Sequence, residues 1–574
     1  MIRTLLLSAV ALLLSAASPT FAQTPSGAAE FSKLVDEYFD AFFKYNPSQG
    51  TAAGFHQYDN QLEDPSREGI NAEVASIKEF QKRFEGVNAQ ELSPEEASDL
   101  ELVKGDMNAR LLALQDIRQW EKNPDVYSRG LTESVYVIMA RNFAPQAERL
   151  KSVIAREEQM ARVFAAARKN LKDPPRVYTD IALEQLPGIV GFFQKDVPAA
   201  FNQVKDPKLL AEFKASNSAV IEGLKRYENF VREDLLPNSN GDFRIGAENY
   251  RKKLLYEEMV DIPLDRLLQI GYDDLHRNQQ AFKEVAAKID PKRTPQQILE
   301  ELEKDHPAPN KLLPAFRNVL GGLRQYIEAN HIVTIPSPRH PIVEETPPFA
   351  RALTSASMDT PGPFEKVAKE AFFNVTQPEP NWPPKKVQSW MEGFNRGTII
   401  STAVHEVYPG HYVQFLWLYD APSKVRKLIG AGSNAEGWAH YCEQMMLDEG
   451  YGNSDPKLRI GQLQDALLRD ARYIAGIEMH TGKMTLEQAT EFFVKEGYQT
   501  QAVAEREAQR GTSDPTYLVY TLGKLEIMKL RADYKAKMGD KFSLQQFHDE
   551  FLKQGFPPIK IIRKAMLGND SPVL

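Results

Sequence analysis

The chain has 574 residues, a formal net charge of −8 at pH 7 and a pI near 5.8. This acidic balance, with no basic stripe along the sequence, argues against a nucleic-acid partner, and the length allows a large core and several domains. The single cysteine, Cys442, excludes an intrachain disulfide. It lies in a helical pattern, and we expect an inert core residue there rather than a thiol nucleophile or a metal ligand.

The N-terminus, residues 1–22, has the pattern of a secretory signal peptide. Arg3 is followed by an apolar run over residues 5–17, and residues 20–22 form a small-residue cleavage site. The run is too short to span a bilayer as an anchor, and no later stretch approaches eighteen apolar residues. We therefore expect a periplasmic or secreted protein with no membrane contact after cleavage.

Helical periodicity dominates the rest of the chain. Apolar residues recur at three- and four-residue steps in three long segments, Phe31–Tyr45, Glu148–Leu171 and Leu209–Leu235. Sequences typical of a capping box at a helix start begin at Ser93, Thr294, Thr485 and Ser543. Strand-like alternation is scarce, and residues 331–336 are its best short example. The sequence predicts a mainly α protein with minor β structure.

Prolines crowd the segment 336–384, which predicts an extended, irregular connection. Such a segment either wraps a cleft or simply links two helical lobes, and the sequence leaves both open. We expect an N-terminal helical lobe at 23–335, this connection, and a C-terminal helical lobe at 385–574. Together the lobes would form one catalytic unit around a deep cleft.

The C-terminal lobe contains the most informative stretch, residues 402–444. Three of the ten histidines of the chain fall here, together with Glu406 and Glu436. Imidazole and carboxylate are the ligands that zinc takes in catalytic sites, where three protein ligands leave a position for water. Glu406 directly follows a histidine, where the zincin pattern places the general base.

The first two predicted ligands, His405 and His411, are six positions apart, which on an unbroken helix separates them by about 120°. Pro409 lacks an N–H and clashes with the carbonyl one turn back, so it should loosen the helix. Gly410 adds backbone freedom at the same place. A bulged turn there would bring both imidazoles to one face, where they could share a Zn2+ ion.

A third ligand is expected on the following helix, which has room to return beside the first after His411. Glu436 and His440 lie one turn apart on the same face of that helix, so spacing alone leaves both open. Glu443 lies two turns beyond Glu436 on that face and is a candidate to hydrogen-bond a ligand histidine. Asp470 is a weaker candidate for the same role.

Three motifs carry a family resemblance: HEVYPGHYVQ at 405–414, EGWAHYCEQ at 436–444 and DPTYLVYTLG at 514–523. They resemble the bacterial domain-of-unknown-function family 885, which is similar to the mostly helical zinc peptidases of the thimet-oligopeptidase and angiotensin-converting-enzyme type. The resemblance covers most of the mature chain. It implies one Zn2+ ion and favours Glu436 as the third ligand, with His440 lining the site.

The same resemblance implies that Tyr520 stabilises the negatively charged oxygen of a tetrahedral intermediate. Any single tyrosine at a helix start is more often a packing residue. The usual Pro-Gly-Gln of the family is here replaced by residues 515–517, which leaves the role of Tyr517 open.

A further polar group, on one predicted helix, contains Arg469, Arg472 and His480. The arginines could clamp the terminal carboxylate of a substrate by bidentate hydrogen bonds. Salt bridges within a helical lobe are the plainer interpretation, and we prefer it.

These features predict an exported zinc metallopeptidase that hydrolyses short peptides, of the oligopeptidase or dipeptidyl-carboxypeptidase kind. The narrow cleft of the similar peptidases implies the restriction to short peptides. Two alternatives stay open: a zinc hydrolase of another amide or ester, and a non-catalytic periplasmic binding protein that keeps the fold. The oligomeric state cannot be read from the sequence.

Overall fold

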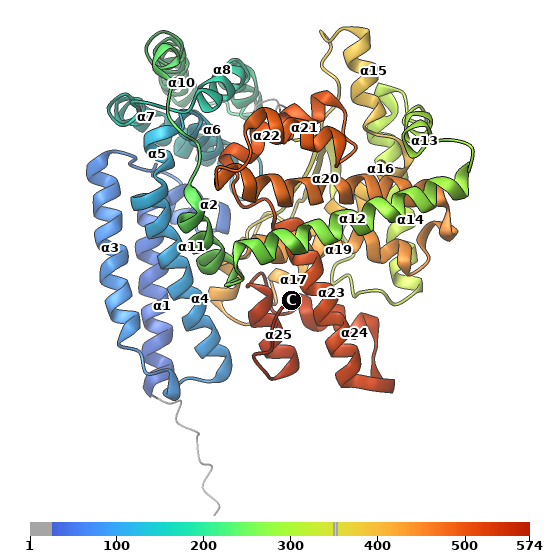
Figure 1. Ribbon diagram of the computed structural model, residues 1–574. Coiled ribbons are helices and arrows are strands. Elements are labelled where there is room, and N and C mark those ends of the chain that lie inside the picture. The colour runs from blue at the N-terminus through green and yellow to red at the C-terminus, as the bar shows by residue number, and fades with distance from the viewer. Residues whose placement is uncertain (1–25, 348–350, 352–353) are drawn as a thin grey trace, which may run out of the picture.

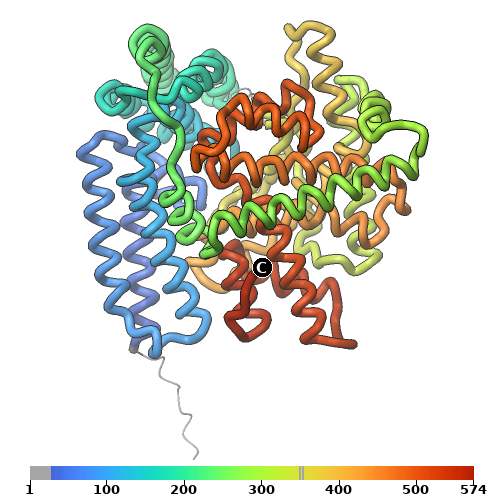
Figure 2. The backbone as a smooth tube through the Cα atoms, viewed as in Figure 1, coloured from blue at the N-terminus to red at the C-terminus, as the bar shows by residue number. Residues whose placement is uncertain are grey.

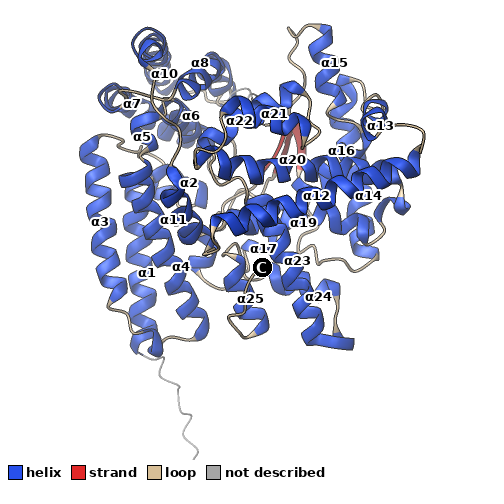
Figure 3. Cartoon of the chain, viewed as in Figure 1, coloured by secondary structure: helices blue, strands red, loops and turns tan. Residues whose placement is uncertain are grey.

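The computed structural model describes residues 26–347, 351 and 354–574. The predicted signal peptide, residues 1–22, lies outside the described residues. Helices make up most of the described chain and strands a small part (Figure 3), which confirms the prediction of a mainly α protein with minor β structure. None of the described helices combines the length and the hydropathy needed to cross a bilayer.

The N-terminal helices form two groups. The long helices α1, α3 and α4 lie side by side, and α6, α7, α8 and α10 pack around an apolar core of their own (Figure 1). The helices of this part are α1 (Ser26–Tyr45), α2 (Pro47–Ala53), α3 (Arg67–Glu85), α4 (Pro94–Leu111), α5 (Gln119–Lys122), α6 (Asp125–Met139), α7 (Gln146–Asn170), α8 (Arg176–Gly191), α9 (Val197–Ala200) and α10 (Pro207–Asn229). The helix predicted over 209–235 is thus α10, continued by the π-helical turn Phe230–Leu235.

The middle of the chain contributes α11 (Gly246–Glu258), α12 (Leu264–Ile289), α13 (Pro295–Leu302) and α14 (Leu312–Ala329). The apolar face of α12, which includes Leu267, Leu275 and Phe282, packs along a long helix of the C-terminal part, α20 (Pro456–His480). The division into lobes at residue 335 stays a prediction, as does the deep cleft.

The three strands lie inside the proline-rich segment. They are β1 (Ile342–Glu345), β2 (Ala356–Asp359) and β3 (Phe372–Val375), in the order β1-β3-β2. β1 is parallel to β3 and pairs Ile342 with Phe372, whereas β2 is antiparallel and pairs Ala356 with Val375. Phe373 and Val375 of β3 are buried in the same apolar core as Phe316 of α14.

The C-terminal part is coloured from yellow to red in Figure 2 and contains the remaining helices. Besides α20 it contains α15 (Pro384–Glu392), α16 (Arg396–Glu406), α17 (His411–Leu418), α18 (Lys424–Leu428), α19 (Gly432–Asp448), α21 (Leu486–Lys495), α22 (Gln501–Ser513), α23 (Val519–Met538), α24 (Leu544–Leu552) and α25 (Ile559–Leu567). α16 packs against both α19 and α20, and α19 packs along α23.

Local signals for helix starts predicted the structure well, and the strand signal did not. Capping boxes form at Ser93, Thr294 and Thr485, and Ser543 caps its helix through its hydroxyl alone. The strand predicted at 331–336 is wrong, because these residues form a loop. Its apolar side chains are buried under the neighbouring helices instead of pairing with another strand.

Candidate metal centre

A sharp turn between α16 and α17 places the two predicted histidine ligands. His405 is the penultimate residue of α16, and His411 is the first residue of α17. The backbone N–H of Gly410 donates to the carbonyl of Val404 at 2.9 Å. A Cβ atom on Gly410 would lie 1.7 Å from the carbonyl oxygen of His405, so only glycine fits this turn. The predicted loosened helix is therefore a complete break into two helices.

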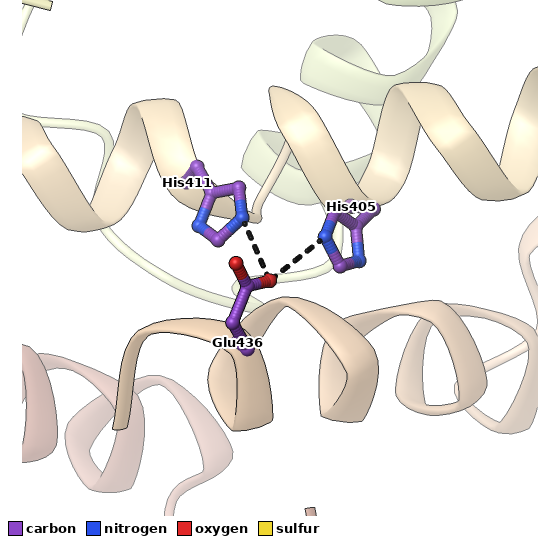
Figure 4. A group of neighbouring side chains, drawn as sticks. All are labelled: His405, His411 and Glu436. Atoms are coloured by element: carbon purple, nitrogen blue, oxygen red, sulfur yellow. Dashed lines mark ion pairs between the residues drawn. The ribbon is translucent and has the colours of Figure 1, made fainter. Parts of the chain in front are cut away.

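The structure brings His405, His411 and Glu436 together, with one ligand atom of each within 4.8 Å of the others. Oε2 of Glu436, on α19, lies 3.4 Å from Nε2 of His405 and 3.4 Å from Nε2 of His411. Figure 4 shows both imidazoles turned toward this carboxylate from the two sides of the turn.

The spacing of these atoms fits a small cation. Two ligands at about 2.1 Å from a tetrahedral zinc ion lie roughly 3.4 Å apart. A separation of 3.4 Å is long for a hydrogen bond, and Oε2 of Glu436 is buried without a hydrogen-bond partner. A cation held by the three residues would satisfy this oxygen, since buried polar atoms rarely stay unpaired.

The electrostatics also favour positive charge at this point. Burial by itself lowers the pKa of His405, but the carboxylates of Glu436 and Glu443 outweigh it and raise that pKa to about 9. Burial raises the pKa of Glu436, yet the two imidazoles hold it well below its usual range. The cluster is therefore built to stabilise a cation next to a carboxylate.

Glu443 contacts Nδ1 of His405, the ring nitrogen that does not face Glu436. Its Oε1 lies 2.7 Å from Nδ1 of His405 and 2.8 Å from the guanidinium of Arg469, and its Oε2 lies 3.0 Å from Nδ1 of His440. Burial raises the pKa of Glu443, but Arg469 and the histidines lower it far more, so the group is a carboxylate. A proton on Nδ1 of His405 leaves the Nε2 lone pair for a metal.

His440 does not belong to the three-residue cluster. It is fully buried and binds Glu443. Burial, helped by the charge of Lys524, lowers the pKa of His440 to about 3, so the ring is neutral. Of the two candidates that spacing left open, the structure therefore brings Glu436 to the histidines. Asp470 binds Asn278 and Thr521 and not a histidine of the cluster.

Glu406 ends α16, directly beside the cluster in sequence, and only 8% of its surface is exposed. Among the described residues, no hydrogen bond or ion pair involves its carboxylate. A carboxylate that is nearly buried and yet uncommitted is free to accept a proton from a substrate or from water.

Tyr520, the second residue of α23, lies against the cluster. Its ring stacks on that of His405, with 6.3 Å between centroids, and its hydroxyl accepts a hydrogen bond of 3.1 Å from Arg510. Burial and the charge of Glu436 raise the pKa of Tyr520, so the hydroxyl keeps its proton. Sequence reasoning missed Arg510, and its position on α22 offered no motif that could have identified it.

Arg469 and Arg472 both face the ring of Tyr520, but each is committed to a carboxylate. Arg469 binds Glu443, and Arg472 donates two hydrogen bonds, of 2.6 and 2.8 Å, to Glu507. The structure therefore arranges both arginines as ion pairs of the helical lobe.

Tyr517 and His480 lie away from the cluster and pack in the core. The Tyr517 ring fits against Gly476 and Gly511, and its hydroxyl is buried without a partner. Nε2 of His480 lies 2.8 Å from the carbonyl of Gly511, and burial lowers the pKa of this histidine to about 4. Neither residue contacts the three candidate ligands.

Close packing of helices fixes the cluster. Gly437 of α19 faces Gly523 of α23, and a Cβ on Gly523 would lie 1.8 Å from the carbonyl oxygen of Ser433. The two backbones can thus approach, which sets Glu436 and Tyr520 at a fixed distance. In addition, the buried carboxylate of Glu258 accepts hydrogen bonds from two N–H groups at the start of α19.

Two solved structures share the fold over almost the whole chain. One, described as a candidate lipoprotein of unknown function from Shewanella oneidensis, is 27% identical, with a TM-score of 0.78 over 94% of this chain and 100% of its own. The other, a candidate lipoprotein from Colwellia psychrerythraea, is 19% identical, with a TM-score of 0.81 over 95% of this chain and 99% of its own.

Among curated proteins, none matches the chain. The model of one family, the bacterial proteins of unknown function called DUF885, matches residues 47–566. This match spans most of the chain and includes every residue of the candidate site. The chain belongs to the bacterial DUF885 family.

Proposed function

We propose that this protein is a zinc-dependent hydrolase that cleaves short peptides. The observation that carries the proposal is the convergence of His405, His411 and Glu436, with two separations of 3.4 Å centred on an oxygen that has no hydrogen-bond partner. Two imidazoles and one carboxylate form a common ligand set of catalytic zinc, and leave one position free.

When bound, zinc supplies Lewis acidity, which polarises a carbonyl group and acidifies water. Glu406 accepts the proton of the attacking water and passes it to the leaving amine. Tyr520 donates its hydroxyl hydrogen to the oxygen that becomes negative, since its raised pKa keeps it protonated. Glu443 keeps His405 in the tautomer and orientation that a metal requires.

Two other functions compete with this one. A zinc hydrolase of a different amide or ester would need the same residues. A binding protein without catalysis would keep the metal ligands, but it has no use for the nearly buried, uncommitted carboxylate of Glu406. That carboxylate favours a hydrolase.

We also propose that the protein acts outside the cytoplasm. The signal-like sequence of residues 1–22 supports export. The two structurally similar proteins are described as candidate lipoproteins, a class that is exported.

Elemental analysis of the purified protein tests the metal. We expect one zinc ion per chain in the natural protein and in Glu406→Gln, and a loss of zinc in His411→Ala. Hydrolysis of a panel of free-ended and blocked short peptides tests the reaction, and turnover should disappear in Glu406→Gln while zinc is retained. Turnover that survives this change would remove Glu406 from the mechanism, and natural protein that binds zinc but cleaves no peptide would favour the alternatives.

A further inference from the structure

A pocket of about 280 Å³ lies between α17 and the proline-rich segment. Its walls combine aromatic rings with charged side chains. One wall is a face of α17 with Tyr412, Phe415 and Leu416, continued by Tyr419 and Asp420 just after the helix. The other wall is formed by residues 336, 337, 339, 360, 361, 369 and 371. This volume is close to the lower end of the roughly 300–1,000 Å³ typical of ligand pockets, and it suits one end of a short peptide.

The pocket is adjacent to the candidate metal centre. His411 begins α17, and the ring of Phe415, one turn later, packs against the His411 ring with 6.3 Å between centroids. Phe415 is also a lining residue of the pocket. The same aromatic ring therefore separates the pocket from a candidate zinc ligand.

The walls of the pocket are held in place by hydrogen bonds. The Tyr412 hydroxyl donates to the carbonyl of Arg339 at 3.0 Å, and the Arg324 guanidinium donates to the carbonyl of Ser337 at 3.0 Å. Lys369, on the same wall as Arg339, donates to the carbonyl of Glu365 and lies over the ring of Tyr419. A site whose walls are already fixed loses little entropy when a ligand binds.

The charges in the pocket are available to a ligand. Arg339 is exposed, and within the described chain neither its guanidinium nor the ammonium of Lys369 has a carboxylate partner. Asp420, also exposed and without an ion pair in the same part of the chain, is the single acidic lining residue. Two cations and one carboxylate leave the pocket with a net positive charge.

We propose that this pocket binds a carboxylate of the peptide substrate, with Arg339 as the main partner and Lys369 supporting it. The aromatic wall of α17 would cover the apolar part of the same residue. The inference rests on the proposed hydrolase function, because it assigns the pocket to a substrate that reaches from the metal centre past Phe415. Arginine suits this role, since its planar guanidinium matches a carboxylate with two parallel hydrogen bonds.

A carboxylate on a short peptide can be its C-terminus or an acidic side chain, and three ligands separate these sources. They are trialanine, trialanine amide, and an amidated tripeptide in which glutamate replaces the last alanine. Binding is measured by calorimetry on Glu406→Gln, which should not turn the ligands over. The series is repeated after zinc is removed with a chelator, because zinc can itself bind a carboxylate.

We expect at least one carboxylate-bearing ligand to bind about tenfold more tightly than trialanine amide, with and without zinc. The ligand with the higher affinity shows whether the carboxylate comes from the C-terminus or from an acidic side chain. Adding Arg339→Gln should remove the difference, and Lys369→Gln should reduce it. The matched control is Arg176→Gln, which removes an exposed arginine paired with Asp180 on α8 and should leave the preference unchanged.

Equal affinities for the three ligands would overturn the inference, as would a preference that survives Arg339→Gln or that depends on zinc. The inference would also be overturned if none of the three ligands bound. The proposed hydrolase is judged separately, by cleavage of peptides with the natural protein. If the protein prefers carboxylate ligands through Arg339 but cleaves no peptide, the assignment of the pocket stands and the proposed hydrolase function is refuted.

Discussion

The carboxylate of Glu443 lies 2.7 Å from Nδ1 of His405, on the side of the imidazole opposite to Glu436. Glu443 thus fixes both the ring orientation and the tautomer of the first candidate ligand. Loss of such a partner typically weakens metal binding 10- to 100-fold. We expect Glu443→Gln to lower zinc affinity by about this factor, measured by competition with a chromogenic chelator.

The matched control is Glu449→Gln, directly after the end of the same helix, where the half-buried carboxylate pairs with Arg531. Zinc affinity should not change in this variant. The melting temperature of each variant is measured in parallel, since Glu443 also pairs with the buried Arg469. Zinc affinity of Glu443→Gln equal to that of the natural protein would exclude the role of Glu443 in orienting the ligand.

The turn at Gly410 gives a second prediction. An alanine Cβ would lie 1.7 Å from the carbonyl of His405, so the turn must open and the two histidines must separate. We expect Gly410→Ala to lose about 1–3 kcal/mol of stability and most of its zinc. Urea denaturation and elemental analysis measure the two effects.

Gly130→Ala is the control for this prediction. Gly130 lies inside α6, and a Cβ there meets no atom within 4 Å. Alanine in a helix interior should leave stability unchanged or raise it by up to about 1 kcal/mol. A Gly410→Ala protein that keeps its zinc and its stability would show that the turn tolerates a side chain.

The sequence predicted those features of the fold and the site that depend on interactions between residues within one or two helical turns. The break between His405 and His411 follows from the Pro-Gly pair within six residues. The helix starts at Thr294 and Thr485 follow in the same way from hydrogen bonds within one turn. Glu436 needed more than spacing, because one helical face offered two candidates, and the family resemblance decided between them.

Contacts between distant segments escaped prediction. Glu258 binds the start of α19 from 174 residues away, and no local pattern indicates such a partner. The hydrogen bond from Arg510 to Tyr520 depends on how α22 meets α23. The strands were also missed, since each has four residues and lies among prolines, where a period-two pattern has no length in which to appear.

Tyr520 and Tyr517 form a matched pair for the third prediction. The Tyr520 ring stacks on the ring of His405, whereas the Tyr517 hydroxyl is buried without a partner. We expect Tyr520→Phe to lower kcat for peptides about 10²- to 10³-fold, with zinc content unchanged, because one donor to the oxyanion is lost. Tyr517→Phe should keep the activity and the stability. Equal kcat in the two variants would refute the role of Tyr520.

The last prediction concerns His56, which joins the N-terminal helices to the proline-rich segment. Its Nδ1 lies 3.0 Å from Asp59, its Nε2 lies 2.8 Å from Glu365, and its ring stacks on Phe143 at 3.8 Å. Burial alone lowers the pKa of His56, but the two carboxylates outweigh it and raise that pKa above its usual 6.5. The folded state therefore binds a proton on His56 more strongly than the unfolded state does.

A group whose pKa is raised by folding contributes its full stabilisation of the folded state at pH values below its pKa in the unfolded chain. This contribution is lost as the pH rises through its pKa in the folded state. We therefore expect His56→Gln to lower the melting temperature most near pH 6 and progressively less above it. Melting curves of both proteins between pH 5.5 and 8.5, about one pH unit below to two above the usual histidine pKa, measure the difference. His276→Gln, at an exposed histidine without an ion pair among the described residues, should show no such trend. A His56→Gln deficit that grows with pH would contradict the assignment of a protonated, doubly paired imidazole.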